Sequence, residues 1–546
     1  MQVLSAAEMQ ACDRATTERY GVPSLKLMRA ASTAVANFAR QQFPDAQRVT
    51  VLCGRGNNGG DGMMTARMLA TAGLKVTTLL LGSPEGMAGD ATAAWRDLAT
   101  PAHGLIHVVN RDSELAYYKA ALDTDLIIDA IVGTGFTPPL RGLPLAALEW
   151  IKDCRAPILA VDLPSGWPAD FSSGSFDGPV FPADAVVTFT APKPAHVFVQ
   201  LTRHWNQAVV VAPIGSPDQA IVSDLRLKWA GSAHALLQAP RLADSNKGRF
   251  GHVLVVGGSV GKSGAPSMAS LAAMRVGAGL VTAAVPAPVL PLVASIAPEL
   301  MAWPLPAHSD GQLAAKSITT DLIQSLTAGK TVAAVGPGLG QGTGVVRLLS
   351  HLIAETDLPL VIDADALNVL SAHPDLFAKL AKSGKTGRTV VLTPHPGEMA
   401  RLTGRSVGEI QANRLDVARR FAEENHVTLI LKGTRTLIAH PDGNVAVNTT
   451  GNPAMAKGGS GDLLTGIVSG LLAQYRNDTV SAVEAAVYLH GLAADLAVRE
   501  VDERTLLATD TVSEFSRAFR FRPRRQNGYV WLQGGLDAAA PKKPDA

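Results

Sequence analysis

Short runs of β-branched and apolar residues alternate with helix-type patterns along almost the whole chain, and this alternation restricts the fold more than any other feature. Strands that alternate with helices form parallel sheets, because each crossover helix returns the chain and covers one face. In the first half, strands are expected at 49–53, 76–81, 126–131, 158–162, 185–189 and 208–212. In the second half, they are expected at 252–256, 279–284, 332–335, 359–363, 389–392, 428–432 and 435–439. The sequence therefore predicts an α/β protein made of three-layer αβα domains.

The chain of 546 residues is too long for one hydrophobic core, so two or three domains are expected. The stretch 213–245 has no clear strand and is broken by prolines and a glycine, which indicates a domain boundary. We therefore expect domains at 1–225 and 226–515. The remaining 516–546 forms a basic tail in which arginines alternate with phenylalanines. Such a tail could contact RNA, but a solvated terminus, or one packed back on the protein, is favoured.

Composition excludes several classes of protein. The formal net charge of +2 gives no reason to expect nucleic acid or a membrane surface as a partner. Three cysteines without CxxC spacing argue against disulfides and a zinc site. No signal peptide and no run of ~18 apolar residues is visible, so a cytoplasmic protein is expected.

The first glycine-rich segment, Gly54-Arg-Gly-Asn-Asn-Gly-Gly-Asp-Gly62, follows strand 49–53 and precedes a helix expected at about 63–72. Its glycines satisfy GxGxxG, the dinucleotide fingerprint. The acid that completes this fingerprint is missing, because strand 76–81 ends in Gly82-Ser-Pro. A standard nicotinamide dehydrogenase site is therefore disfavoured. What remains is a helix N-terminus suited to a phosphate, with Asn57, Asn58 and Asp61 beside it.

Two more strands of the first half end in oxygen-bearing side chains. Strand 126–131 carries Asp129 and leads into Gly133-Thr-Gly135, and strand 158–162 ends in Asp162-Leu-Pro-Ser165. Ligands of such sheets bind at the carboxyl ends of the strands. Asn58, Asp129 and Ser165 would then converge as hard oxygen ligands of an alkali or alkaline-earth cation, with Asp162 as an acid or base. The alternative is that both aspartates only cap loops, but three such strand ends favour a site.

These motifs, together with Asp-Ala-Ile-Val-Gly-Thr-Gly and Val-Asp-Leu-Pro-Ser-Gly, resemble the YjeF N-terminal domain, an NAD(P)H-hydrate epimerase. The resemblance implies a Rossmann-like sheet. It also implies that the hydrated cofactor is contacted by Asn57, Asn58, Gly59, Gly60, Asp61, the 133–139 loop with Gly133, Thr134 and Gly135, and Asp162. By the same resemblance, Asn58, Asp129 and Ser165 hold K⁺.

The second half has a P-loop-like segment, Gly257-Gly-Ser-Val-Gly-Lys-Ser-Gly264, but the first glycine of the Walker pattern is replaced by Val256. A tight turn before a helix at 265–276 is expected instead. Further strand ends carry Gly336-Pro-Gly-Leu-Gly340, Asp363-Ala-Asp, Thr393-Pro-His-Pro-Gly-Glu398 and Lys432-Gly-Thr-Arg-Thr436. A functional His395 is favoured over a structural one, because two prolines flank it. Lys432 and Thr436 offer a charge and a hydroxyl to a phosphate.

Residues 452–462, Asn-Pro-Ala-Met-Ala-Lys-Gly-Gly-Ser-Gly-Asp, directly precede an amphipathic helix pattern. The glycines leave backbone N–H groups open at a helix N-terminus, where the dipole favours anions. Asp462 follows in the first helical turn, a position suited to moving a proton beside bound phosphate. The alternative is that Asp462 only caps the helix.

The order of these motifs over roughly 240–510 resembles the ribokinase-like superfamily, and within it the ADP-dependent NAD(P)H-hydrate dehydratases. The resemblance implies that the adenine nucleotide contacts Gly461 and the stretch Lys432, Gly433, Thr434, Arg435 and Thr436. It also implies that Ala265, His395, Asp462 and one of Gly338 and Gly340 face the hydrate.

Both halves together resemble the bifunctional NAD(P)H-hydrate repair enzymes. That resemblance implies interconversion of the R and S hydrates by the first domain and dehydration of the S form by the second. ADP would be the co-substrate, with Mg²⁺ at its phosphates, and a cytoplasmic homo-oligomer is expected. One alternative is a vitamin-type small-molecule kinase of the same superfamily. Another is a non-catalytic dinucleotide-binding module, at least for the first half.

Overall fold

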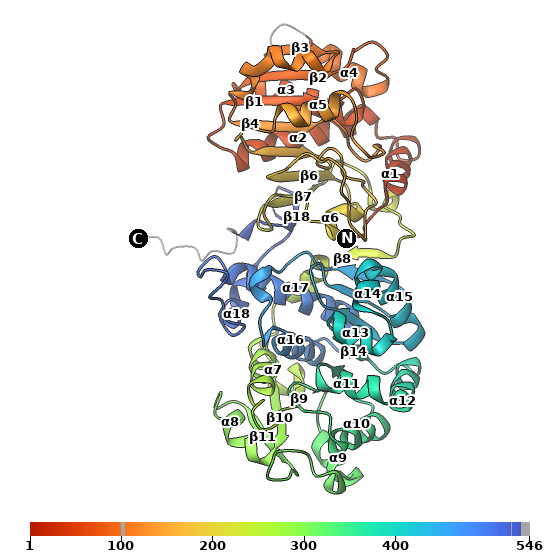
Figure 1. Cartoon of the computed structure of the whole chain (residues 1–546), viewed down its shortest axis with the longest axis vertical. Coiled ribbons are helices and arrows are strands. Elements are labelled where there is room, and N and C mark those ends of the chain that lie inside the picture. The colour runs from red at the N-terminus through yellow and green to blue at the C-terminus, as the bar shows by residue number, and fades with distance from the viewer. Residues whose placement is uncertain (100–103, 526, 537–546) are drawn as a thin grey trace. The chain divides into compact units, whose positions relative to one another are not determined.

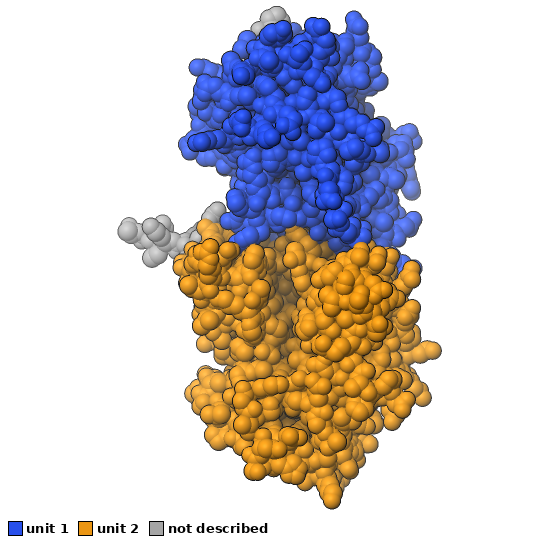
Figure 2. Space-filling model, viewed as in Figure 1, with its two compact units in different colours: residues 1–227, 522–535 blue, residues 228–521, 536–546 orange. Residues whose placement is uncertain are grey.

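The computed structural model describes residues 1–99, 104–525 and 527–536. The chain divides into two compact units: unit 1 contains Met1–Leu227 and Arg522–Gly535, and unit 2 contains Lys228–Phe521 (Figure 2). Every strand predicted from the sequence is present, with its ends within two residues of the predicted ones. The prediction of an α/β fold with helices on both faces of the sheets is confirmed.

Unit 1 has an eight-stranded sheet in the order β18-β7-β6-β5-β4-β1-β2-β3 (Figure 1). All neighbouring strands are parallel except β18, which is antiparallel to β7. The strands are β1 (Arg48–Cys53), β2 (Lys75–Leu81), β3 (Leu105–Val109), β4 (Leu126–Ala130), β5 (Ile158–Val161), β6 (Ala185–Phe189), β7 (Ala208–Ala212) and β18 (Val530–Gln533).

Side-chain alternation along the strands of unit 1 produces two hydrophobic layers. One face, with Val51 and Ile128, packs against α2 (Ser24–Gln42), α3 (Asn57–Thr71) and α4 (Gly89–Leu98). The opposite face, with Leu52 and Ile127, packs against the 3₁₀ segment η1 (Asp112–Leu122) and α5 (Leu143–Trp150). The unit also contains α1 (Ala6–Glu18), α6 (Pro194–Phe198) and η2 (Asp218–Ala220).

Unit 2 has a ten-stranded sheet in the order β11-β10-β9-β12-β13-β14-β15-β16-β17-β8. It is parallel from β11 to β15, whereas β16 and β17 pair antiparallel. The strands are β8 (Leu227–Trp229), β9 (His252–Val256), β10 (Leu280–Pro286), β11 (Met301–Leu305), β12 (Val332–Val335), β13 (Leu360–Ile362), β14 (Val390–Leu392), β15 (Thr428–Leu431), β16 (Leu437–Ala439) and β17 (Val445–Val447).

Helices cover the sheet of unit 2 on both faces, with α7 and α16 packed against each other (Figure 1). They are α7 (Gly264–Arg275), α8 (Leu290–Ala294), α9 (Thr320–Thr327), α10 (Thr343–Glu355), α11 (Asp365–Ala372), α12 (Pro374–Lys385), α13 (Pro396–Thr403), α14 (Val407–Ala412), α15 (Arg414–Asn425), α16 (Ser460–Gln474), α17 (Thr479–Ala497), α18 (Asp510–Ser513) and α19 (Phe515–Arg520). Short 3₁₀ segments are η3 (Ala230–Gln238), η4 (Lys247–Phe250), η5 (Ala287–Val289), η6 (Ala315–Ser317) and η7 (Pro453–Met455).

Helix α17 is the one helix in the described part of the chain that is long and apolar enough to cross a membrane, and 89% of its apolar window is buried inside the fold. Its sequence is apolar because it is surrounded by protein on nearly all sides, which identifies it as a core helix.

The C-terminal segment, predicted as a basic tail at 516–546 that is solvated or packed back on the protein, is packed back on it where the structure describes it. Residues up to Phe521 belong to unit 2, and the chain then returns to unit 1 as β18. Tyr529 and Trp531 are buried in the core of unit 1 against Phe38, and the guanidinium of Arg525 lies 3.9 Å from the Trp531 ring centre. Aromatic burial thus anchors this segment. Residues 526 and 537–546 of the predicted tail lie outside the described part.

Candidate functional site

In unit 1 the strand order reverses between β1 and β4, and the crevice at their carboxyl ends is the place where such sheets bind ligands. The turn after β1 is tight: Gly54 N–H donates to Ala130 O at 3.1 Å, and a Cβ on Gly59 would lie 1.8 Å from Gly54 O. Helix α3 starts at Asn57 rather than at the predicted 63. The residues 57–61 therefore form its first turns, at the positive end of the helix dipole.

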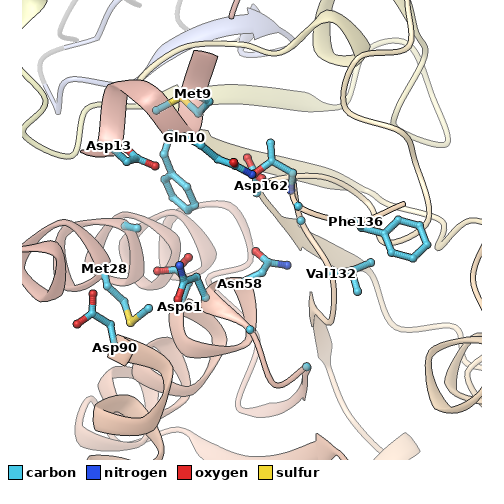
Figure 3. A pocket seen from close by; sticks show the side chains of 18 of the residues that line it. Met9, Gln10, Asp13, Met28, Asn58, Asp61, Asp90, Val132, Phe136 and Asp162 are labelled. Atoms are coloured by element: carbon cyan, nitrogen blue, oxygen red, sulfur yellow. Dashed lines mark hydrogen bonds between the residues drawn. The ribbon is translucent and has the colours of Figure 1, made fainter. Parts of the chain in front are cut away.

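A cavity of about 1020 Å³ opens at this crevice (Figure 3). Its wall contains most of the residues predicted to contact the hydrate, namely Asn57, Asn58, Asp61, Gly133, Thr134, Gly135 and Asp162. Gly59 and Gly60 do not line it, because they are buried behind the turn and against Met28 respectively. Helix α1 adds Met9, Gln10 and Asp13 to the wall.

Asp162 follows β5 with a positive φ of 67°, and it is held by three donors. Lys193 Nζ lies 2.7 Å and Thr188 Oγ1 2.8 Å from Asp162 Oδ1, and Thr134 N–H donates to Oδ2 at 3.1 Å. Burial alone would raise the pKa of this carboxyl, but Lys193 and the other donors outweigh it and lower the pKa to about 2. Asp162 is therefore ionised at neutral pH.

His196 supports this arrangement through the backbone carbonyl of Asp162. Its Nδ1 accepts the Lys193 N–H at 3.0 Å, so Nε2 carries the proton and donates to Asp162 O at 2.7 Å. Burial and the nearby Lys193 ammonium lower the pKa of His196 to about 4. The ring is therefore neutral and orients the turn that presents Asp162.

Two further carboxyls on the cavity wall, those of Asp61 and Asp13, have raised pKa values. Burial, together with the charges of Asp162 and Asp13, raises the pKa of Asp61 well above its usual range. Burial also raises the pKa of Asp13 to about 6, although Lys193 opposes the shift. The cavity thus combines an ionised carboxylate, Asp162, with a carboxyl, Asp61, whose surroundings favour its protonated form, the division that acid and base chemistry needs.

The predicted cation ligands form two groups. Asp129 is fully buried in β4 and accepts from Ser165 N–H at 2.8 Å and from Ser165 Oγ at 2.6 Å. Burial raises the pKa of Asp129 to about 6 despite these bonds. Asn58 lies beside Gly133, where an added Cβ would be 3.3 Å from Asn58 Oδ1 and 3.0 Å from Asp162 Oδ2. Both the oxygen and the nitrogen of the Asn58 amide are buried without a hydrogen-bond partner in the described part of the chain, which is rare for buried polar atoms.

Lys193, Thr188, His196 and Asp13 were not predicted from the sequence. Lys193 and His196 belong to Lys193-Pro-Ala-His196, which follows strand β6, so the strand-end rule applied elsewhere would have found them. Asp13 lies on the amphipathic N-terminal helix, and its sequence context gives no such signal.

In unit 2 the strand order reverses between β9 and β12. The turns after these strands touch: Gly258 N–H donates to Pro337 O at 2.8 Å. A Cβ on Gly338 would lie 2.8 Å from Lys262 O and 3.2 Å from the Ala265 Cβ, so Gly338 is the loop glycine that lies against Ala265. Gly340 instead donates its N–H to Asp365 Oδ2 at 2.8 Å.

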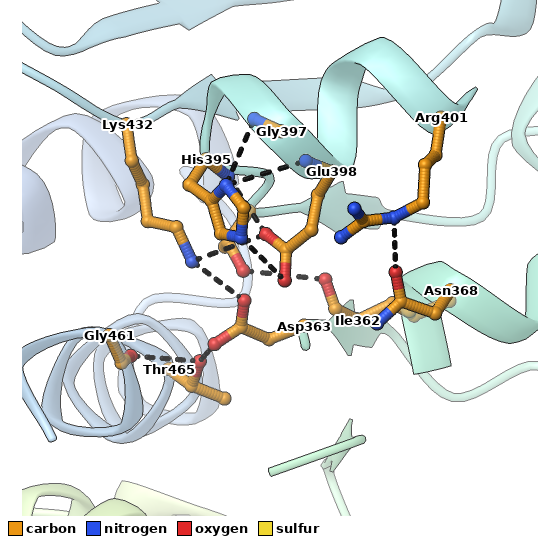
Figure 4. Close-up of polar contacts among 11 residues, drawn as sticks. Ile362, Asp363, Asn368, His395, Gly397, Glu398, Arg401, Lys432, Gly461 and Thr465 are labelled. Atoms are coloured by element: carbon orange, nitrogen blue, oxygen red, sulfur yellow. Dashed lines mark hydrogen bonds and ion pairs between the residues drawn. The ribbon is translucent and has the colours of Figure 1, made fainter. Parts of the chain in front are cut away.

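Lys432 lies at the centre of a polar cluster in unit 2 (Figure 4). Its Nζ is 2.9 Å from Asp363 Oδ1 and 3.8 Å from Glu398 Oε2, and Thr465 Oγ1 donates to Asp363 Oδ2 at 2.7 Å. Burial would lower the pKa of Lys432, but the two carboxylates dominate and raise it. The pKa of Asp363 is lowered by Lys432 and its donors against the effect of burial. Both groups are therefore charged.

His395 both caps a helix and presents an imidazole edge. Its Nδ1 accepts the Gly397 and Glu398 N–H groups at the start of α13, at 3.0 and 3.4 Å. Its Nε2 lies 3.5 Å from Glu398 Oε1, and the side chain is 51% exposed. Burial lowers the pKa of His395, with Lys432 adding to the effect, so the neutral ring offers an Nε2–H donor.

The loop before α16 meets the Lys432 cluster. A Cβ on Gly461 would lie 3.4 Å from Lys432 Nζ and 3.8 Å from Asp363 Oδ2, and Gly459 has a φ of +97° at the helix N-cap. Asp462 stands in the first turn of α16, as predicted. Burial and the neighbouring Asp363 raise its pKa to about 6, although Lys432 opposes this. A carboxyl with that pKa can exchange a proton near neutral pH.

In the predicted nucleotide-binding stretch 432–436, several side-chain and backbone groups form hydrogen bonds within the protein. Arg435 is buried, and its Nη1 donates to Thr449 O at 3.1 Å, within the fold. Thr436 Oγ1 donates to Gly433 O at 2.8 Å, and Arg414 donates to Thr434 O. The side chain of Lys432 is paired with carboxylates. Lys432 Nζ is the group of this stretch that is shown beside the glycine loop, 3.4 Å from the position of a Cβ on Gly461.

Two protein-family models match the chain. The model of the YjeF-related protein N-terminus covers residues 24–195, and that of NAD(P)H-hydrate dehydratase covers 253–517. The bifunctional NAD(P)H-hydrate repair enzyme Nnr of Moorella thermoacetica is 39% identical over 515 residues, which span 93% of this chain and 95% of that protein. The enzyme of the same name from Coxiella burnetii is 37% identical over 90% of this chain and 94% of its own length.

Among solved structures, the ADP/ATP-dependent NAD(P)H-hydrate dehydratase of Bacillus subtilis, co-crystallised with ATP/Mg²⁺, is 35% identical, with a TM-score of 0.44. It covers 53% of this chain and 96% of that one.

Proposed function

We propose how individual residues carry out the chemistry of this chain, which belongs to the family of bifunctional NAD(P)H-hydrate repair enzymes. The protein is an NAD(P)H-hydrate epimerase and an NAD(P)H-hydrate dehydratase. We assign the epimerase to unit 1 and the dehydratase to unit 2, because the two family models fall within them. The full-length relatives described above are named as repair enzymes, which favours this function over a small-molecule kinase.

For the epimerase, we assign the acid to Asp61 and the base to Asp162. Epimerisation at the hydrated carbon requires its C–O bond to break and reform on the opposite face. Protonated Asp61 gives its proton to the departing hydroxyl, which leaves as water, while the ring nitrogen lone pair forms a C=N bond. A water on the opposite face then adds to the planar carbon and gives a proton to Asp162, and proton exchange with solvent restores both groups. Lys193 keeps Asp162 ionised for this step.

Asn58, Asp129 and Ser165 are the residues that would hold K⁺ in unit 1. The orphaned buried amide of Asn58 and the two buried oxygen donors support this fit. A bound K⁺ would supply a fixed positive charge that orders the loop around Gly133. Exchanging K⁺ for tetramethylammonium should slow epimerisation severalfold, and Asp129→Ala should abolish that difference. Equal rates in the two salts for the unmodified protein would contradict the cation assignment.

For the dehydratase, we assign nucleotide phosphate binding to the Gly458–Gly461 loop and Lys432, and proton transfer to Asp462. Asp462 takes the proton of the hydrate hydroxyl, whose oxygen attacks the terminal phosphorus of ADP and releases AMP. The phosphate ester then leaves as inorganic phosphate, and loss of a proton from the neighbouring carbon restores the ring double bond. The observation that supports this best is the approach of Gly461 to Lys432 beside Asp462.

Mg²⁺ would enter unit 2 with the nucleotide. Among the described residues, no three His, Cys, Asp or Glu side chains group as a metal site. Mg²⁺ commonly uses substrate phosphates, waters and one or two carboxylates, and Asp462 is the acid closest to the glycine loop in sequence. When bound, it would neutralise charge on the transferring phosphoryl group.

The proposed function is tested by incubating the protein with an R/S mixture of hydrated NADH, with and without ADP. Interconversion of R and S without ADP, and recovery of NADH absorbance only with ADP, are expected. Phosphorylation of hydroxymethylpyrimidine or pyridoxal, without recovery of NADH, would instead support the kinase. The cytoplasmic location and the homo-oligomeric state stay predictions.

A further inference from the structure

We propose that Arg55 binds the 2′-phosphate of NADPH hydrate and makes unit 1 prefer this substrate to NADH hydrate. The inference rests on the proposed epimerase function. It concerns the end of strand β2, where the dinucleotide fingerprint requires an acid and this chain has none.

In dinucleotide sites of this topology, an acid at the end of the second strand binds the ribose hydroxyls and repels a 2′-phosphate. Here β2 ends at Leu81, and the next residue is Gly82, with a φ of +108°. Glycine removes both the acid and the side-chain volume at this point. Asp90, the acid that α4 adds to the cavity wall, lies beside Met28 and Asp61 in Figure 3.

Arg55 takes the space that Gly82 leaves. A Cβ on Gly82 would lie 3.0 Å from Arg55 Cδ and 3.2 Å from Nε, so any larger residue at position 82 would displace the arginine. Both residues line the cavity, and Arg55 is exposed. Within the described ranges, Arg55 forms no hydrogen bond or ion pair with the protein, in contrast to Lys193 on the same wall. Its guanidinium therefore has all its donors available to a ligand.

The chemistry of this position fits a phosphate monoester. A guanidinium is always charged and offers a planar fork of donors that matches phosphate oxygens. Arg55 precedes the N-terminus of α3 by two residues, so one turn provides two positions for anions. The helix N-terminus suits the diphosphate that both substrates share. Arg55, over the end of β2, suits the phosphate that only NADPH hydrate carries.

The test compares epimerisation of NADPH hydrate and NADH hydrate by the full-length protein without ADP, which leaves unit 2 inactive. Arg55→Ala should reduce kcat/KM for NADPH hydrate about 10-fold or more, and that for NADH hydrate less than about 2-fold. Arg55→Lys keeps the charge but loses the planar fork of donors. Its kcat/KM for NADPH hydrate should lie between the values of the wild type and Arg55→Ala. Arg29→Ala removes an exposed arginine of α2 that does not line the cavity, and it should leave the ratio unchanged.

Four results would overturn the proposal. An equal loss for both hydrates in Arg55→Ala would assign Arg55 to the diphosphate or the adenine. An unchanged ratio of the two kcat/KM values in Arg55→Ala would show that Arg55 does not recognise the 2′-phosphate. An equal effect of Arg29→Ala would show that net charge alone is responsible. A wild-type protein that epimerises neither hydrate would remove the proposed function and this inference together, before any variant is made.

Discussion

The two units place the same three residue types at their sites, an aspartate with a lysine and a threonine, but they use them in opposite ways. Asp162 binds Lys193 and Thr188 in unit 1, and Asp363 binds Lys432 and Thr465 in unit 2. In unit 1 the lysine side chain is the more buried partner, 2% exposed against 9% for the aspartate. In unit 2 the order is reversed, with Lys432 20% exposed and Asp363 2% exposed.

This reversal decides which charge faces the ligand. In unit 1 the lysine is a buried counter-ion that keeps Asp162 ionised at the cavity wall. In unit 2 the aspartate is the buried counter-ion, and Lys432 faces Gly461 and the glycine loop. We therefore assign the reactive carboxyl of unit 2 to a separate residue, Asp462, whose pKa is raised rather than lowered. With the proposed roles, the same ion pair would support a base in one unit and a phosphate-binding cation in the other.

The largest expected difference follows removal of each lysine. Lys193→Met leaves a buried carboxylate without its partner and should destabilise unit 1 by about 3–5 kcal/mol. Lys432→Met should cost unit 2 about half as much, because Lys432 is partly solvated and Thr465 still binds Asp363. Urea unfolding, monitored separately for each unit by hydrogen exchange, measures both, with exposed Lys119→Met as the control. Equal losses would contradict the comparison of burial.

The second prediction concerns the separate acid of unit 2. Asp462→Asn should slow dehydration at least ~10²-fold, about 2.7 kcal/mol of barrier, because the proton acceptor is lost. Epimerisation should not change, and ADP should bind as well or slightly better, because a negative charge beside the phosphates is removed. Recovery of NADH absorbance and calorimetry with ADP test these points. Near-normal dehydration would reduce Asp462 to a helix cap.

The two threonines give a smaller and more symmetric test. Thr188→Val and Thr465→Val keep the side-chain shape but remove one hydrogen bond to a buried carboxylate, at a cost of about 1.5 kcal/mol each. In unit 1 the change should also slow epimerisation, because Asp162 is the reacting group. In unit 2 the stability should fall with little effect on dehydration. A large loss of dehydration in Thr465→Val would mean that Asp363 itself takes part in the chemistry.

The smallest effect is a difference in pH dependence. Dehydration needs ionised Asp462, whose pKa is about 6, so its rate should fall about 10-fold per pH unit below that value. Ionised Asp162, with a pKa of about 2, persists at these pH values. Epimerisation should instead decline as the pH rises and Asp61 loses its proton, because burial and the charges of Asp162 and Asp13 raise the pKa of Asp61. Initial rates of the two reactions from pH 5 to 9 measure the opposite trends, and parallel profiles would contradict the assignments.

Much of the fold was predictable because it follows from local patterns. The strand positions rest on runs of apolar residues, and the glycine segments rest on conformations that only glycine adopts easily. Strands β3, β8, β11, β17 and β18 were not predicted. Four of them, β3, β8, β11 and β18, lie at sheet edges, where the burial that creates a clear pattern is often incomplete. β18 pairs with a strand more than 300 residues earlier in the chain, and no local signal records such a pairing.

The sequence by itself predicted which strand ends and helix starts carry chemistry, including those with Asn58, Asp129, Asp162, His395 and Asp462, and these roles stay predictions. It could not determine the charge state or orientation of these groups. Lys193 lies 31 residues from Asp162 in the sequence, and Lys432 lies 69 residues from Asp363, yet each pair forms a hydrogen bond in the fold. The sequence likewise contained no sign that Arg435 is buried and that its guanidinium donates to Thr449 O. Only the tertiary structure decides such matters, because desolvation and ion pairing depend on what surrounds a group in space.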